Sequence, residues 1–111
     1  MPADLLQGKL DMLILKTLDV ESLHGYAIAQ RIEQSSRALL SVPQGSLYPA
    51  LHRLENRGWL AAEWVETDAG RNAKVYRLTP KGRRRLQQEI DDWQRLSQAI
   101  GWVLGVEGNL P

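Results

Sequence analysis

The side chains that could form a nucleophilic catalytic site are Ser46, His24 and His52, and none of them lies in a motif that activates a nucleophile. The sequence has neither a glycine-flanked serine elbow nor a glycine-rich phosphate loop. It has no cysteine, which excludes disulfides, thiolate metal sites and cysteine nucleophiles together. Two histidines alone do not make a metal cluster. We therefore expect a protein that is not an enzyme and that holds no metal and no cofactor.

A second set of polar side chains has the types and spacing that suit binding to a duplex. In segment 44–58, Leu47, Leu51 and Leu54 recur at i, i+4 and i+7, which predicts a helix with its leucines facing the core. The opposite face is polar, and arginine and asparagine can read base edges in the major groove. The candidate DNA contacts here are Gln44, Ser46, Tyr48, Pro49, His52, Arg53 and Asn56, with Arg53 first among them.

A basic hairpin follows this helix. Segments 60–66 and 74–79 alternate as strands do, and a turn-rich connection separates them. Centring the hairpin on Gly70 places Ala62 opposite Leu78 and Trp64 opposite Tyr76, with the apolar side chains on one face. The candidate contacts to phosphates or the minor groove are Arg71, Asn72 and Lys74.

A long last helix is predicted from the Thr79-Pro80 start to about Leu104, since threonine is a good N-cap and proline suits the first helical position. Its apolar residues form a seam longer than the small domain can cover, so we expect a partner helix from a second copy. The first helical segment, 5–18, is also apolar on several sides. The candidate dimer contacts are Leu6, Leu10, Leu86, Ile90, Trp93, Leu96, Ile100 and Val103.

Length and composition place these elements in one small globular protein. The 111 residues are 43% hydrophobic and 24% charged, which is ordinary for a globular chain. The net charge is only +1, but basic residues concentrate between positions 44 and 85, which favours a polyanionic partner for that surface. No apolar run is long enough to span a membrane and no signal peptide is evident, so we expect no membrane association and a cytoplasmic location.

The element order predicts a mainly α fold with a small β-hairpin, a winged helix-turn-helix. A second helix is expected to open at His24 and Gly25 and to bury Gly25, Ile28, Ala29 and Ile32. We expect a DNA-binding domain in residues 1–79 with its wing at about 60–79, a dimerisation helix at 80–104, and a flexible tail at 105–111.

The sequence resembles the PadR-like transcriptional regulators through motifs that follow one another along nearly the whole chain: LHGY at 23–26, GSLYPALHRLENRG at 45–58 and YRLTPKG at 76–82. It is similar to the short branch, in which one helix follows the wing. The resemblance implies a two-fold symmetric homodimer that binds a roughly palindromic operator, commonly as a repressor released by a small aromatic or drug-like effector. It also places Trp93 where some members line an effector pocket.

Two alternatives stay open. A winged helix can bind protein instead of DNA, because a fold does not dictate function; added salt would weaken DNA binding steeply but not a hydrophobic protein contact. Trp93 offers a large π-face to a planar ligand, but it could equally pack as an ordinary seam residue.

Overall fold

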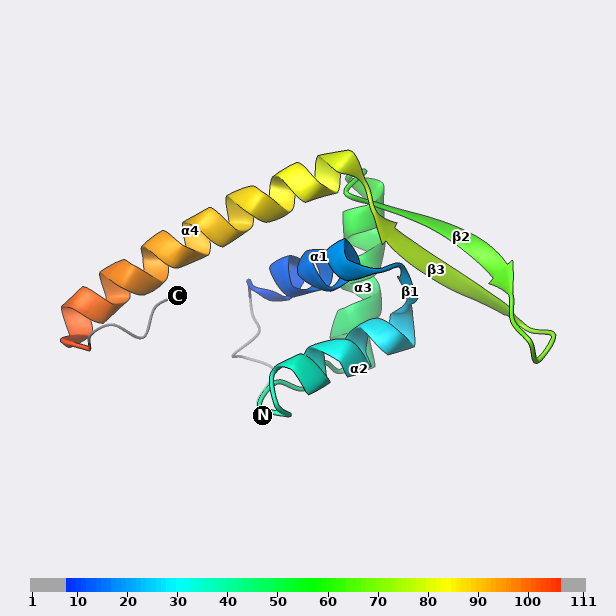
Figure 1. Ribbon diagram of the computed structural model, residues 1–111, viewed down its shortest axis with the longest axis horizontal. Coiled ribbons are helices and arrows are strands. Elements are labelled where there is room, and N and C mark those ends of the chain that lie inside the picture. Colours follow the sequence, from blue (N-terminus) through cyan, green and yellow to red (C-terminus); the bar gives the residue numbers. More distant parts are fainter. Residues whose placement is uncertain (1–7, 107–111) are drawn as a thin grey trace.

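The computed structural model describes residues 8–106 and has the helices and the hairpin in the order that the sequence predicted. The elements are α1 (Leu10–Val20), β1 (Leu23–His24), α2 (Gly25–Ser35), α3 (Gln44–Asn56), β2 (Leu60–Glu66), β3 (Asn72–Leu78) and α4 (Pro80–Leu104). Three short helices cluster together, the β2–β3 hairpin projects to one side and α4 extends to the other (Figure 1). The predicted mainly α fold with a small β-hairpin is confirmed.

The core lies among α1, α2, α3 and the base of the sheet. Leu47, Leu51 and Leu54 of α3 are fully buried, and the predicted stripe of α2 is buried as well. Helix α1 begins at Leu10, after a turn that contains Gly8 in the left-handed region (φ +79°). It therefore starts later than the predicted position 5. Residue Leu6 and positions 107–111 of the predicted tail lie outside the described residues.

A glycine explains how closely α2 and α3 approach each other. A Cβ atom at Gly25 would lie 2.9 Å from Cε1 of Tyr48 and 3.4 Å from Cδ1 of Leu51. Only a glycine leaves room for the Tyr48 ring at the start of α2, because real Cβ atoms are not found so close to another carbon. The HGY and GSLYPAL motifs thus meet in one contact.

The sheet has three strands in the order β1-β3-β2, one more than the sequence predicted. Strand β1 is only two residues long, and it pairs Leu23 with Tyr76. The predicted hairpin register was wrong by two residues, because Ala62 pairs with Tyr76 and Trp64 with Lys74. The loop joins the paired Glu66 and Asn72, and its left-handed Gly70 (φ +76°) is not at its centre. An even shift leaves the apolar side chains on one face, as predicted.

Helix α4 begins where the sequence predicted and is fixed there by its first turn. The Thr79 hydroxyl accepts a hydrogen bond from the Gly82 N–H (3.0 Å), and it lies 2.7 Å from the Gly58 carbonyl oxygen, to which it donates. A Cβ atom at Gly82 would lie 2.0 Å from the Trp59 carbonyl oxygen, so α4 packs directly on backbone. With 25 residues, the helix is about 37 Å long at the standard rise.

Candidate nucleic-acid interface

The polar side of α3 is exposed along the whole helix. All seven residues that the sequence assigned to this face are exposed; they are Gln44, Ser46, Tyr48, Pro49, His52, Arg53 and Asn56. His52 and Asn56 are hydrogen-bonded to each other across one turn at 3.2 Å. The face therefore offers a continuous polar surface about 20 Å long for 13 residues at the helical rise.

Pro49 lies inside α3, where a proline is unusual. The helix starts at Gln44, with Pro43 as its N-cap. Proline has no N–H group, so the carbonyl of Gly45 loses its usual helical partner. Both residues are on the exposed face, where water can satisfy that carbonyl, and this is why the proline is tolerated.

Arg53 stands at the edge of this face beside α1 and is held by an acid. Its Nη2 forms a salt bridge with Oδ1 of Asp11 in the first turn of α1. The arginine side chain remains 45% exposed, so its other donors still reach the surface. This pairing could not be predicted from local sequence patterns, because the two residues are 42 positions apart.

Lys74 of the wing is paired in the same way at the other edge of α3. Its ammonium lies 3.0 Å from Oε1 of Glu55, and both side chains are about one-third exposed. The hydrogen bond to Glu55 raises the pKa of Lys74 above its ordinary value, with partial burial opposing the effect. The lysine is therefore charged at neutral pH, but its charge is matched by a carboxylate.

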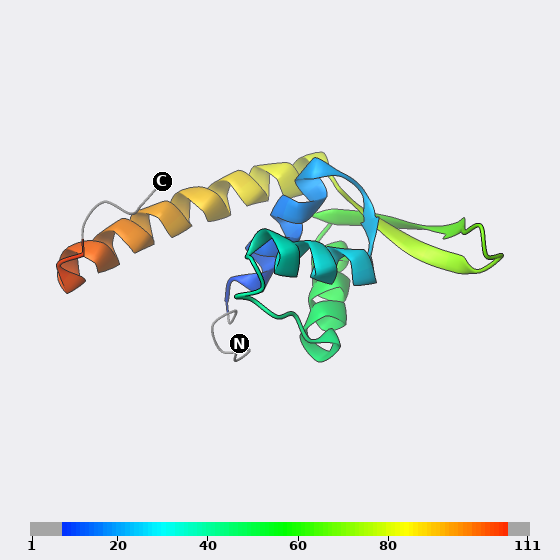
Figure 2. The same cartoon turned by 60° about the horizontal axis from the view of Figure 1, so that its bottom comes forward.

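The other two predicted wing contacts lie near the tip of the wing and are accessible to a ligand. Arg71 and Asn72 are both exposed. The Arg71 backbone closes the turn, because its carbonyl accepts a hydrogen bond from the Thr67 N–H (2.7 Å). Figure 2 shows the wing projecting opposite to α4, while α3 leaves the helix cluster in a third direction. The contact between Lys74 and Glu55 joins the wing to α3, and Arg71 and Asn72 lie beyond it toward the tip of the wing.

An aromatic pocket next to this surface was missed by the sequence reasoning. It lies between the wing, the start of α2 and α3, has a volume of about 360 Å³, and is lined by Tyr26, Tyr48, Trp64, Lys74 and Tyr76, among others. The residues come from four separate segments, the start of α2, α3, β2 and β3, so no local spacing could have grouped them. The aromatic residue types were the only available signal.

The predicted dimer seam divides into buried and exposed parts. Leu86 is 3% exposed and belongs to the core of its own chain, so its prediction as a dimer contact is wrong. Leu10 and Ile90 are half-buried against the same core. The four remaining residues within 8–106 are 40% to 86% exposed; they are Trp93, Leu96, Ile100 and Val103. The Lys9 ammonium lies 5.4 Å from the centre of the Trp93 ring.

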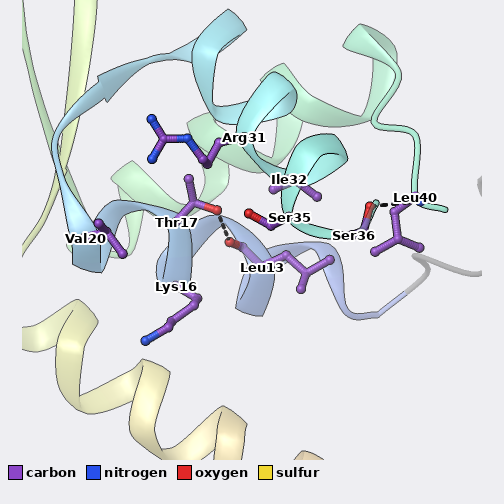
Figure 3. Close-up of a pocket in the computed structure, with 9 residues that line it drawn as sticks. All are labelled: Leu13, Lys16, Thr17, Val20, Arg31, Ile32, Ser35, Ser36 and Leu40. Atoms are coloured by element: carbon purple, nitrogen blue, oxygen red, sulfur yellow. Dashed lines mark hydrogen bonds between the residues drawn. The ribbon is translucent and has the colours of Figure 1, made fainter. Parts of the chain in front are cut away.

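A second apolar surface lies between α1 and α2, shown in Figure 3. This groove has a volume of about 380 Å³, and Leu13, Val20, Ile32 and Leu40 supply its apolar lining. The Thr17 hydroxyl donates to the Leu13 carbonyl (2.8 Å), so it offers no unused proton to the groove. Lys16 and Arg31 stand among the lining residues.

The chain has three helices followed by a hairpin, and the third helix exposes its polar face beside that hairpin. This arrangement defines a winged helix-turn-helix protein. Within residues 8–106, no helix is long and apolar enough to cross a membrane. In the same part of the chain, no group of three or more histidine, aspartate or glutamate residues is arranged to hold a metal ion.

Comparison with known proteins gives the family. Residues 14–88 match the model of the transcriptional regulator PadR-like family. A transcriptional regulator of Mycobacterium tuberculosis is 39% identical over 77 residues, which are 69% of this chain and 68% of the relative. The chain therefore belongs to the PadR-like family of transcriptional regulators, and these are not enzymes.

Solved structures agree with this assignment. A transcriptional regulator from Clostridium thermocellum is 28% identical, with a TM-score of 0.81 over 88% of this chain and 95% of the other. A PadR family transcriptional regulator from Eggerthella lenta is 32% identical, also with a TM-score of 0.81, over 94% and 88% of the two chains. The likeness extends over the wing and α4, because these matches cover most of the chain.

Proposed function

We propose that the protein regulates transcription by binding double-stranded DNA, with α3 in the major groove and the wing against the adjacent backbone. The observation that carries this proposal is the exposed, leucine-free face of α3 beside a basic hairpin. A helix of about 10–12 Å diameter fits a major groove about 12 Å wide. His52, Arg53 and Asn56 are then the base-reading candidates, while Arg71, Asn72 and Lys74 approach phosphates. A chromosomal operator would place the protein in the cytoplasm.

Two internal ion pairs determine what DNA must offer. Arg53 has to exchange Asp11 for a base edge, and Lys74 has to exchange Glu55 for a phosphate, or each must contact DNA with the donors that its acid leaves free. Arginine can do the latter, because the guanidinium has five donors in a planar fork. A guanine edge, with two acceptors, is the base that best suits such a fork.

We also propose that the DNA-binding form is a homodimer on a roughly palindromic operator. Trp93, Leu96, Ile100 and Val103 make a stripe that the chain itself leaves exposed. The α1–α2 groove of a second copy is an apolar surface that could receive the end of this stripe (Figure 3). Covering both surfaces at once in each protomer gives the two-fold symmetric contact expected of a dimer.

Regulation by a ligand is the remaining part of the proposal. A repressor that a small aromatic or drug-like molecule releases needs an accessible aromatic face, and Trp93 is 40% exposed on the proposed dimer stripe. A ligand stacked there would replace the Lys9 ammonium over the ring or share the ring with it. It would bind at the junction of α1 and α4, close to the proposed contact between protomers.

The test of DNA binding first selects the bound duplexes from a pool of random sequences. Binding to the selected duplex is then measured by fluorescence anisotropy at several salt concentrations. We expect selection of a sequence with two-fold symmetry and an affinity that falls steeply as salt rises. Arg53→Ala should lose about 1–3 kcal/mol on the selected duplex and discriminate less between bases, whereas Lys74→Ala should weaken all duplexes evenly and lower the salt slope by about one.

The control is Arg37→Ala, which removes an exposed cation from the loop after α2 and should change neither property. Equal losses on selected and random duplexes in Arg53→Ala would contradict the role given to Arg53, and a loss confined to the selected duplex in Lys74→Ala would contradict the role given to Lys74. A wild-type protein that ignores every duplex at low salt would favour the alternative, a winged helix that binds protein.

A further inference from the structure

The aromatic pocket beside α3 has a rigid floor and walls. Tyr76 is 6% exposed, and the Lys74 ammonium lies 5.3 Å from the centre of its ring. The Tyr48 ring is fixed against Gly25, where a Cβ atom would come within 2.9 Å of it. These contacts come from β3, α2 and α3, so the pocket is already formed before any ligand arrives.

The rim of the pocket is open. Trp64 is 68% exposed, Tyr26 55% and Tyr48 44%. A pocket of about 360 Å³ is near the lower end of the range for small-molecule sites, about 300–1,000 Å³, but such sites bury most of their ligand. The exposed rim instead suits one unit of a longer molecule that continues past the pocket.

The lining chemistry suits an anion attached to an apolar ring. Tyr26 and Tyr48 bring hydroxyl groups and Lys74 brings an ammonium. Among the residues that the structure describes, no carboxylate lines the pocket, although Glu55 stands behind Lys74. Helix α2 starts at Gly25 beside the pocket, and a helix N-terminus carries partial positive charge. The indole of Trp64 adds a broad apolar surface at the rim.

We propose that this pocket binds one sugar–phosphate unit of the DNA backbone, next to the groove that α3 enters. Tyr26 and Tyr48 donate to a phosphate oxygen, Lys74 supplies charge, and Trp64 packs on the deoxyribose. Tyr26 and Trp64 thereby become positioning residues that set the register of α3 on the duplex, since phosphate and sugar contacts fix orientation without reading sequence. The inference rests on the proposed DNA binding.

The test uses a labelled mixed-sequence duplex of about 30 base pairs, long enough for two half-sites one helical turn apart. Binding is measured by anisotropy at about 50 mM salt, where phosphate contacts are strong. Tyr26→Phe should weaken binding about tenfold, as expected for the loss of a hydrogen bond to a charged group. Trp64→Ala should weaken it by a similar factor, and Trp64→Phe should restore most of the loss.

Matched controls are Gln34→Ala, exposed near the other end of α2, and Val65→Ala, the next residue along β2 and therefore on the other face of the wing. Both should bind within about twofold of wild type. A purely structural role for Trp64 is tested with a benzoylphenylalanine photo-cross-linker, which should cross-link to the duplex from position 64 and not from position 65.

Wild-type binding together with unchanged affinity in Tyr26→Phe and Trp64→Ala would overturn this inference and leave the proposed function standing. Absence of cross-linking from position 64 would also overturn it. Failure of the wild-type protein to bind the duplex would remove the proposed function, and this inference with it.

Discussion

The first two turns of α4 and the distal part of the same helix meet different surroundings, although similar apolar spacing runs through both. Leu86 is 3% exposed and packs in the core of its own chain, while Ile100 is 46% and Val103 86% exposed. The distal part of the helix, orange in the figures, extends away from the other helices and from the sheet in both views (Figures 1 and 2). A seven-residue repeat therefore marks an apolar stripe without saying which molecule covers it.

The physical reason for the difference is the length of the helix. The core of α1, α2 and α3 reaches only as far along α4 as Ile90, the last residue of that helix packed against it. The seam residues beyond it stay 40% to 86% exposed, and burial is worth about 25 cal/mol per Å² of apolar surface. This is the part of the molecule on which a second copy can supply stability.

The largest expected effect on stability comes from shortening the buried side chain of Leu86. Leu86→Ala should lower the free energy of unfolding by about 2–5 kcal/mol, because it leaves a cavity in the core. The loss should be the same at every protein concentration. Thermal and urea unfolding followed by circular dichroism measures it, and Ile100→Ala is the matched variant, whose effect should grow with protein concentration. A concentration-independent loss in Ile100→Ala would contradict the division of α4.

A charge in the exposed stripe should break the proposed dimer without unfolding the protomer. Ile100→Glu should weaken self-association by at least about tenfold, since an unpaired charge in an apolar interface is costly. Sedimentation velocity over a range of concentrations measures this change. Gln98→Glu adds the same charge to an exposed position of the same helix and should leave association unchanged. An Ile100→Glu protein that sediments like wild type would exclude this stripe as the interface.

The smallest expected effect concerns the cap that joins α4 to the domain. Thr79→Ala removes the hydroxyl that accepts from Gly82 N–H and donates to the Gly58 carbonyl, so we expect a loss of about 1 kcal/mol in unfolding free energy. Thr79→Ser should retain most of it. Urea unfolding distinguishes the two, and an equal loss in both would show that the methyl group, not the hydroxyl, is responsible.

Much of the fold could be predicted because local signals determine it. The leucine spacing of α3 and the Thr79-Pro80 start of α4 are both properties of short segments, and the structure confirms them. The two-residue strand β1 was not predictable, because two residues carry no periodicity. The hairpin register was missed because the position of Gly70 within its loop depends on the loop's own hydrogen bonds.

The site was predictable only in part. Helical geometry correctly gave the exposed side of α3, since that follows from where the leucines point. The acids that hold Arg53 and Lys74 could not be foreseen, because Asp11 and Glu55 are distant in sequence from the cations they pair with. The prediction of Leu86 as a dimer contact was wrong for a related reason, since only the folded domain shows how far its core extends along α4.

The backbone contact at Gly82 determines the direction in which α4 leaves the domain. Because the start of the helix rests on the Trp59 carbonyl with no side chain between them, substitutions farther along α4 leave this joint intact. The surface that the outer turns of α4 present can therefore be altered by substitution without changing the angle at which the helix leaves the domain.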